Sequence, residues 1–197
     1  HMKKIAMIGL GNPGPQYAYT RHNAGFLALD AFMKRFAGVQ KEENKKNYQL
    51  FHCMIEGVRV YLLKPMTYMN LSGIAVQEFF QKTGMEVEDI VVIYDDVALD
   101  LGRMRLRKNG SAAGQKGLKH IIQQTGTDEI KRIKIGIGPK DIPSLPDFVL
   151  SKFREDDREK LDWILRQVSN AMKDILKDDF ENIMNRYNGM KWEGDGD

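Results

Sequence analysis

One segment near the start of the chain reads Gly9-Leu-Gly-Asn-Pro-Gly-Pro-Gln-Tyr-Ala-Tyr-Thr-Arg-His-Asn-Ala-Gly-Phe26. The apolar run at residues 5–8 predicts a buried strand before it, and apolar residues at helical spacing over residues 26–36 predict a helix after it. Hydrogen-bonding side chains gather in the connection, at Asn12, Tyr17, Arg21, His22 and Asn23. A connection that only turned the chain would not need so many of them. The segment therefore predicts a functional site between the first strand and the first helix.

The glycines of this segment follow the spacing G-x-G-x-x-G from Gly9, which is typical of dinucleotide-binding loops. In those loops the last glycine opens directly into a helix that meets the pyrophosphate. Here Pro13 and Pro15 bias the residues before them away from the helical conformation. The acidic residue expected about 20 positions later, after a second strand, would be Asp30, which falls inside the predicted helix. We therefore expect no nucleotide cofactor, and none of any other kind.

Composition indicates an ordinary globular domain. A chain of 197 residues with 42% hydrophobic and 29% charged residues suits one domain, which we expect to span residues 3–188. His1 and Met2 resemble an expression scar, and residues 189–197 a disordered tail. No apolar run approaches the roughly 20 residues of a membrane span, and the single Cys53 excludes an intramolecular disulfide. We expect a cytoplasmic monomer that has no contact with membranes.

Positive charge is concentrated in the middle of the chain. Residues 103–134 contain nine basic and two acidic residues, a net charge of +7, whereas residues 155–181 contain nine acidic and five basic ones, a net charge of −4. The alternation of Arg103, Arg105 and Arg107 with apolar residues places the three arginines on one face of a strand. The central block therefore predicts contact with a polyanion, and nucleic acid is the natural candidate.

Predicted strands and helices alternate along the chain. Further strands are expected at residues 48–55, 58–63, 90–94, 103–107 and 132–137, and further helices at residues 72–83, 118–125, 155–176 and 180–187. Residues 41–47 are polar, without periodicity, and are expected to form a connector. This order predicts an α/β fold: a single-domain three-layer sandwich with a twisted, mixed, mainly parallel sheet.

Several motifs, in this order, resemble those of bacterial peptidyl-tRNA hydrolases, which cleave the ester that joins a peptide to the 3′ end of tRNA. They are the segment at residues 9–26, Lys64-Pro-Met-Thr-Tyr-Met-Asn-Leu-Ser-Gly73, Val91-Val-Ile-Tyr-Asp-Asp96, Arg132-Ile-Lys-Ile-Gly-Ile-Gly138, and Val149-Leu-Ser-Lys-Phe153, which we expect to form part of a lid. The resemblance covers nearly the whole chain. It implies peptidyl-tRNA as the substrate.

The residues themselves support hydrolytic chemistry. His22 precedes a predicted helix, whose dipole disfavours the imidazolium and so leaves a base that can accept a proton near neutral pH. Asp95, after a neighbouring strand, is the best-placed carboxylate to fix the tautomer of that histidine. The motifs contain no plausible serine or cysteine nucleophile, so water is the expected attacker. His52 and Cys53 point to opposite faces of a strand and cannot share a metal ion, and we expect no metal site.

The resemblance implies roles that agree with this chemistry. His22 would activate water, Asp95 would orient it, and Asn12 and Asn70 would hold the substrate near the ester carbonyl. Tyr17 and Tyr68 would line the groove for the tRNA 3′ end, with Met69 packed against it. From the basic block, Arg105, Arg107 and Lys134 are expected to contact tRNA.

The chain departs from the family in one loop. The usual pattern Gly-Ser-Ala-Gly-Gly-His-Asn-Gly is replaced by Gly110-Ser-Ala-Ala-Gly-Gln-Lys-Gly117, so that Ala113, Gln115 and Lys116 differ. Lys116 offers only donors and a charge, and a glycine-rich loop before a helix favours phosphate as its partner. Two other functions stay open: a catalytically weak RNA-binding paralogue, and a general esterase that does not bind nucleic acid.

Overall fold

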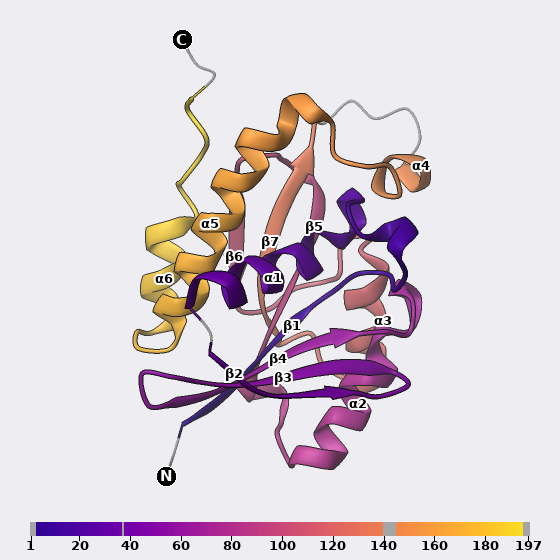
Figure 1. Cartoon of the computed structure of the whole chain (residues 1–197), viewed down its shortest axis with the longest axis vertical. Coiled ribbons are helices and arrows are strands. Elements are labelled where there is room, and N and C mark those ends of the chain that lie inside the picture. The colour runs from indigo at the N-terminus through magenta and orange to yellow at the C-terminus, as the bar shows by residue number, and fades with distance from the viewer. Residues whose placement is uncertain (1–2, 37, 140–144, 195–197) are drawn as a thin grey trace.

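Seven strands form one mixed sheet in the order β2-β3-β4-β1-β5-β7-β6. The computed structural model describes residues 3–36, 38–139 and 145–194 (Figure 1). The strands are β1 (Lys4–Gly9), β2 (Val39–Asn44), β3 (Tyr48–Ile55), β4 (Val58–Pro65), β5 (Ile90–Asp100), β6 (Met104–Arg107) and β7 (Lys131–Gly138). The helices are α1 (Ala24–Phe36), α2 (Ser72–Thr83), α3 (Lys116–Thr125), α4 (Leu145–Val149), α5 (Arg158–Ile175) and α6 (Phe180–Tyr187).

The parallel part of the sheet lies at its centre. Strands β4, β1, β5 and β7 run in the same direction, while β2, β3 and β6 pair antiparallel at the two sides. The expected α/β fold with a mixed sheet is confirmed. Because the central strands are parallel, their carboxyl ends share one edge, which is where open α/β sheets place their sites.

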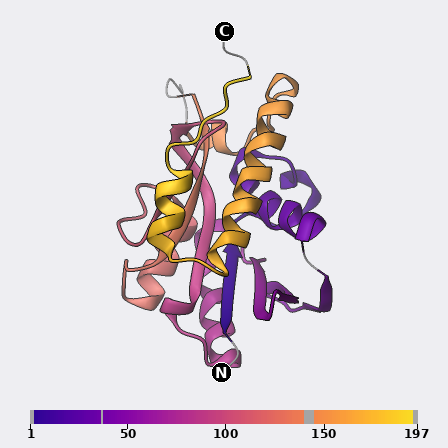
Figure 2. The same ribbon diagram turned by 90° about the vertical axis from the view of Figure 1, so that its left-hand side faces the viewer.

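A separate apolar core covers each face of the sheet. On one face Phe32 of α1, Val168 of α5 and Ile183 of α6 pack together with the strands. On the other face Phe79 of α2 and Leu118 of α3 do the same. Figures 1 and 2 show the resulting three layers. Both faces of the central strands are therefore buried, which explains why β5 begins as a continuous apolar run.

Turn chemistry agrees with the sequence at three places. Ile55 pairs with Val58 across a two-residue hairpin, and both Glu56 (φ 52°) and Gly57 (φ 81°) adopt the positive φ that such a turn requires. Gly84 and Gly126 end α2 and α3 in the left-handed conformation.

Among the described residues, no helix has both the length and the apolar character needed to cross a bilayer.

The polar connector predicted at residues 41–47 is wrong for most of its length. Val39–Asn44 forms β2, an edge strand that pairs with β3. Almost all of its residues are exposed, so it carries no apolar alternation from which a strand could be predicted. Charged side chains on an edge strand protect it from pairing with other chains. One of them, Glu43, binds His52 of β3 through Oε2 over 2.6 Å.

The strand predicted at residues 90–94 continues further than expected. β5 runs on to Asp100, with a register shift against β7 between Asp96 and Asp100. Its pairing with β1 ends where Gly9 lies opposite Ile93. Asp95 therefore lies inside β5, but beyond the end of its neighbour β1. Its side chain faces the loop that follows β1 instead of another strand.

The tail beyond α6 is not disordered in its described part. Trp192 donates its backbone N–H to the carbonyl of Gly102, and the backbones of Lys191 and Arg103 form an isolated antiparallel β-bridge. The Trp192 ring meets the ring of Trp163 of α5 edge-on. Figure 1 shows this segment running along α5. The aromatic contact explains why residues 189–194 have a defined position, whereas residues 195–197, like residues 1 and 2, lie outside the described residues.

Candidate active site

A cavity of about 590 Å³ opens at the carboxyl edge of the central strands. The loops that follow β1 and β4 border it, together with β5, the start of α3 and the lid segment around α4. The chain leaves β1 toward α1 on one face and leaves β4 toward α2 on the other, so a crevice forms between neighbouring strands. Of the predicted site residues, the cavity is bordered by Asn12, His22, Tyr68, Met69, Asn70, Asp95, Lys116 and Lys134.

His22 and Asp95 form a direct pair on one side of this cavity. Nδ1 of His22 lies 2.8 Å from Oδ2 of Asp95, and both residues are buried, at 8% and 3% exposure. His22 belongs to the 3-10 turn η2 (Arg21–Asn23) directly before α1. A carboxylate on Nδ1 requires the hydrogen there, so the lone pair of a neutral His22 is on Nε2. This is the arrangement of a general base with an orienting acid.

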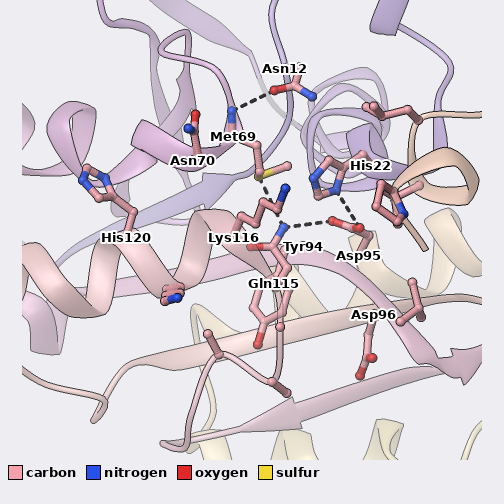
Figure 3. A pocket seen from close by; sticks show the side chains of 18 of the residues that line it. Asn12, His22, Met69, Asn70, Tyr94, Asp95, Asp96, Gln115, Lys116 and His120 are labelled. Carbon is pink, nitrogen blue, oxygen red and sulfur yellow. Dashed lines mark hydrogen bonds and ion pairs between the residues drawn. The ribbon is translucent and has the colours of Figure 1, made fainter. Parts of the chain in front are cut away.

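Asn12 is held from three sides. Its backbone N–H donates to Oδ1 of Asn23 over 2.8 Å, and its carbonyl accepts from Nδ2 of Asn23 over 3.0 Å. Its side-chain Oδ1 accepts from the backbone N–H of Met69 over 2.7 Å. These contacts fix the amide so that its NH₂ group points away from Met69 (Figure 3). Asn12 therefore presents an oriented donor at the cavity, which is what a developing oxyanion requires.

The loop after β4 carries a strained tyrosine. Tyr68 has φ 64° and ψ 154°, a conformation that only glycine adopts easily. Its side chain is 53% exposed, and its ring meets that of Tyr17 edge-on with the centroids 6.5 Å apart. Tyr17 does not itself border the cavity. The two rings make an aromatic surface at the cavity mouth, next to Asn70.

Met69 borders the cavity, and it also holds the surrounding loops together. It is buried, and its sulfur accepts a hydrogen bond from Nε2 of Gln115 over 3.3 Å, while its backbone binds Asn12. Gln115 also donates to Asp95. Met69 therefore connects the loops after β1 and β4 to the start of α3, through its hydrogen bonds with Asn12 and Gln115 (Figure 3).

Arg21 attaches the lid segment to the turn that carries His22. Its guanidinium donates to the hydroxyl of Ser151 and to the carbonyl of Lys152, each over 2.6 Å, and lies over the Phe148 ring at 4.3 Å. Burial lowers the pKa of this guanidinium, while Asp157 raises it. Figure 1 shows α4 beside this turn. The residues that border the cavity include Val149 and Leu150, both within the lid segment predicted at residues 149–153.

Three predicted cationic residues gather beside the cavity. Arg105 of β6 lies opposite Lys134 of β7 in the sheet. Burial lowers the pKa of Lys134; Asp96 raises it, and Arg132, Arg107 and Arg105 lower it further. Arg105 and Arg107 do not border the cavity themselves. Lys134 does, so the basic patch of Arg105, Arg107 and Lys134 reaches it at one side.

Arg132 does not belong to that surface, although it was counted in the basic block. It is fully buried and donates to three backbone carbonyls, those of Ile130, Ser111 and Asp128, over 2.8–3.1 Å. A buried cation bound to carbonyl oxygens cannot meet a polyanion. Its contact with Ser111 instead fixes the glycine-rich loop that leads to α3.

Metal ligands do not cluster in the described residues: no group of three histidine, cysteine, aspartate or glutamate side chains is arranged to hold an ion. His120, which also borders the cavity, accepts a hydrogen bond at Nδ1 from the backbone N–H of Gly73 over 2.9 Å.

Comparison with known proteins agrees with this geometry. The sequence model of the family described as peptidyl-tRNA hydrolase matches residues 6–194. A peptidyl-tRNA hydrolase of Clostridium perfringens (strain SM101 / Type A) is 43% identical over 190 residues, covering 96% of this chain and 100% of that protein. One from Exiguobacterium sibiricum is 45% identical over 183 residues, covering 92% and 98%. The chain belongs to the peptidyl-tRNA hydrolase family.

Structural similarity extends over the same length. The crystal structure of peptidyl-tRNA hydrolase from Acinetobacter baumannii has a TM-score of 0.88 and 32% sequence identity to this chain, and the match covers 97% of this chain and 98% of that one. The resemblance in the motifs is therefore confirmed at the level of the family. Family membership shows that the chain is a hydrolase with this fold.

Sequence reasoning named Arg21 and Gln115 but did not predict the contacts that they make beside the cavity. Arg21 and Gln115 contact the lid and Asp95, respectively. A signal for Gln115 was present: it stands directly before a helix start, where serine, threonine, asparagine or aspartate is preferred, so a glutamine there calls for another explanation. Arg21 was named among the hydrogen-bonding residues of the first loop, but its contact with the lid could not be predicted, because its partners lie 130 and 131 residues away.

Proposed function

We propose that this protein hydrolyses the ester between a peptide, or an N-acylated amino acid, and the 3′-terminal ribose of tRNA, and so releases free tRNA for translation. The observation that carries the proposal is the contact of His22 with Asp95 in a cavity that also presents the oriented amide of Asn12. Together these groups supply a base, its orienting acid and an oxyanion donor.

His22 takes the proton from the attacking water. Asp95 holds the hydrogen on Nδ1, so the water donates to Nε2, and its oxygen adds to the ester carbonyl. Asn12, with Asn70 beside it, donates to the oxygen that becomes negative in the tetrahedral intermediate. When the intermediate collapses, the imidazolium returns its proton to the departing ribose oxygen. Asp95 stabilises the imidazolium in between.

The tRNA 3′ end occupies the mouth of the cavity in this proposal. Tyr68 and Tyr17 stack against its terminal nucleotide, and the buried Met69 fixes the loop that carries Tyr68. The basic patch of Arg105, Arg107 and Lys134 binds the phosphates further along the strand, and Lys116 binds one at the start of α3. The partner is the acceptor end of peptidyl-tRNA. We propose that the protein acts as a monomer in the cytoplasm, without a metal ion or cofactor.

Single-turnover cleavage of N-acetylaminoacyl-tRNA tests the function. The unaltered protein should release the acylated amino acid from the tRNA, and His22→Ala should abolish turnover while it leaves tRNA binding nearly intact. Asp95→Asn should lower turnover less completely, because the base remains but its tautomer is no longer fixed. His52→Ala is the matched control, since His52 lies on β3 and binds Glu43. A His22→Ala protein with the rate of the unaltered protein would contradict the mechanism.

The same assay separates the two other functions. An RNA-binding paralogue would bind tRNA without cleaving it, and a general esterase would cleave simple esters with no preference for tRNA. The complete pair of His22 and Asp95 argues against the RNA-binding paralogue, and the net charge of +7 over residues 103–134 argues against an esterase that does not bind nucleic acid.

A further inference from the structure

Asp95 uses both of its carboxylate oxygens. Oδ2 binds Nδ1 of His22 over 2.8 Å, and Oδ1 accepts a hydrogen bond from Nε2 of Gln115 over 3.0 Å (Figure 3). The carboxylate is nearly buried. A carboxylate that has a donor on one oxygen only can rotate about its bond to Cβ, whereas donors on both oxygens fix the plane of the group.

The orientation of the Gln115 amide follows from its other contacts. Its Oε1 accepts from the backbone N–H of Leu118 over 2.8 Å, as the cap of α3. The two hydrogens on Nε2 then face Oδ1 of Asp95 and the sulfur of Met69. The opposite orientation would place the amide oxygen against the carboxylate and the NH₂ group against the N–H of Leu118. Both of those contacts are repulsive, so only the observed orientation is stable.

From this geometry we propose that Gln115 is a positioning residue for the reaction. It holds Asp95 in the plane that His22 requires, through a donor that stays uncharged at every pH. This inference rests on the proposed function. Gln115 acts through Asp95, and it is tied to Met69 and thereby to the loop of Asn12. The start of α3 and the catalytic pair are therefore coupled through one amide.

A glutamine has a particular consequence for pH dependence. A histidine at this place could both cap α3 and donate to Asp95 only while neutral, because an imidazolium has no acceptor. A glutamate could cap α3 but could donate only when protonated. The charged and titratable groups that border the same cavity are His22, Tyr68, Tyr94, Asp95, Asp96, Lys116, Lys119, His120 and Lys134. Of these, His22 and Asp95 belong to the catalytic pair, so an ionisable residue at position 115 would add a further titration in direct contact with it.

Gln115→Glu is the decisive variant, because it keeps the cap on α3 and replaces only the NH₂ group that donates to Asp95 and Met69. Two carboxylates in contact cannot both ionise without cost, and a proton shared between them restores the donor. We expect kcat to be lower by about tenfold or more near pH 8, as for the loss of a hydrogen bond to a charged group, with KM for the tRNA substrate unchanged. The deficit should narrow to within about threefold near pH 6 as the pair takes up a proton. The optimum of kcat should therefore move to lower pH.

Three further variants complete the test. Gln115→His should approach the unaltered kcat near pH 8 and lose activity more steeply below about pH 6.5, the ordinary pKa of histidine. Gln115→Met, which offers no donor, should be impaired at every pH. Gln124→Glu makes the same change on an exposed part of α3 and should leave the profile unaltered.

The outcomes distinguish the inference from the function on which it rests. If the unaltered protein cleaves N-acetylaminoacyl-tRNA and Gln115→Glu has the same kcat and the same pH profile, the positioning role is wrong. A Gln115→Glu deficit that does not change with pH would show a structural role only, and would also overturn the inference. If the unaltered protein does not cleave the substrate at all, the proposed function is wrong, and this result is separate from any comparison between variants. Should Gln115→Met not fold, the pH profile of Gln115→Glu still decides.

Discussion

The backbone N–H of Met69 donates a hydrogen bond to Oδ1 of Asn12 over 2.7 Å, across the loops that follow β4 and β1. This bond takes up the acceptor of the Asn12 amide and leaves its NH₂ group as the donor at the cavity (Figure 3). Without this hydrogen bond, the side-chain amide of Asn12 could rotate and exchange the positions of its oxygen and its NH₂ group. The loop after β4 therefore decides which end of the Asn12 side chain a substrate meets.

Asn12→Asp should lower kcat by about 10²- to 10³-fold, the usual cost of removing one oxyanion donor. An aspartate keeps the acceptor for the Met69 N–H, so the loops stay joined, but it presents a negative oxygen where the oxyanion forms. Single-turnover cleavage of N-acetylaminoacyl-tRNA measures the effect. Asn44→Asp, which makes the same change on the exposed strand β2, should cleave at the unaltered rate. Equal rates for both variants would exclude Asn12 from the chemistry.

Lys116→Asn should weaken the salt dependence of tRNA binding and leave turnover at saturation similar. The Lys116 side chain borders the cavity from the first position of α3 (Figure 3), where the backbone N–H groups already favour an anion. Removing one phosphate interaction reduces the slope of log K against log salt by about one. Binding titrations at several salt concentrations measure this slope. A rise in turnover by orders of magnitude would instead mean that Lys116 impairs the site.

Replacing Arg105, Arg107 and Lys134 with glutamine should weaken tRNA binding and flatten its salt dependence. The three cations influence one another across β6 and β7, so a polyanion on this face meets their combined charge. Each phosphate that the triple variant no longer binds should reduce the slope by roughly one. Lys177→Gln is the matched control, because Lys177 pairs with Glu56 in the acidic part of the molecule. An unchanged slope in the triple variant would place the tRNA on another face.

The pair of His22 and Asp95 could be predicted from the sequence, although the two residues lie 73 positions apart. His22 follows β1, and Asp95 lies on β5 just beyond the end of β1. The two strands are parallel neighbours, and the carboxyl ends of such strands meet at one edge. Gln115 could not be predicted in the same way. Its hydrogen bond to Asp95 depends on how the start of α3 packs against the sheet. No local sequence pattern specifies that packing.

The predictions for Arg132 and for residues 41–47 were wrong for physical reasons of the same kind. Arg132 alternates with apolar residues in β7 and was counted in the basic block that predicts contact with a polyanion, yet it is fully buried. The strand period tells which residues share a face, but it does not tell whether a loop covers that face. Likewise β2 carries no apolar alternation for a periodicity to detect, because both of its faces are exposed.

Glu43→Gln should lower stability near neutral pH, and the difference should disappear in acid. Hydrogen bonds from Lys82 and His52 lower the pKa of Glu43 from 4.5 to about 2. Because this pKa is lower in the folded state, the charged group stabilises the fold above about pH 4.5 and loses that effect as the pH falls toward 2. The effect should be modest, since the Lys82 side chain is 40% exposed. Denaturant unfolding near pH 7, 5 and 3 measures it, and parallel stability curves for the two proteins would contradict it.

Ala113→Gly should stabilise the protein. Ala113 has φ 49°, in the left-handed region, where a residue with Cβ pays about 1–2 kcal/mol. Glycine removes this strain but makes the unfolded chain more flexible, at about 0.5–1 kcal/mol. The net gain, between zero and about 1.5 kcal/mol, corresponds to a rise in Tm of up to roughly 3–6 °C for a domain of this size. Ala112→Gly is the matched control: Ala112 has no positive φ, so the same change should destabilise. If both variants lost stability equally, the backbone at Ala113 would not be strained.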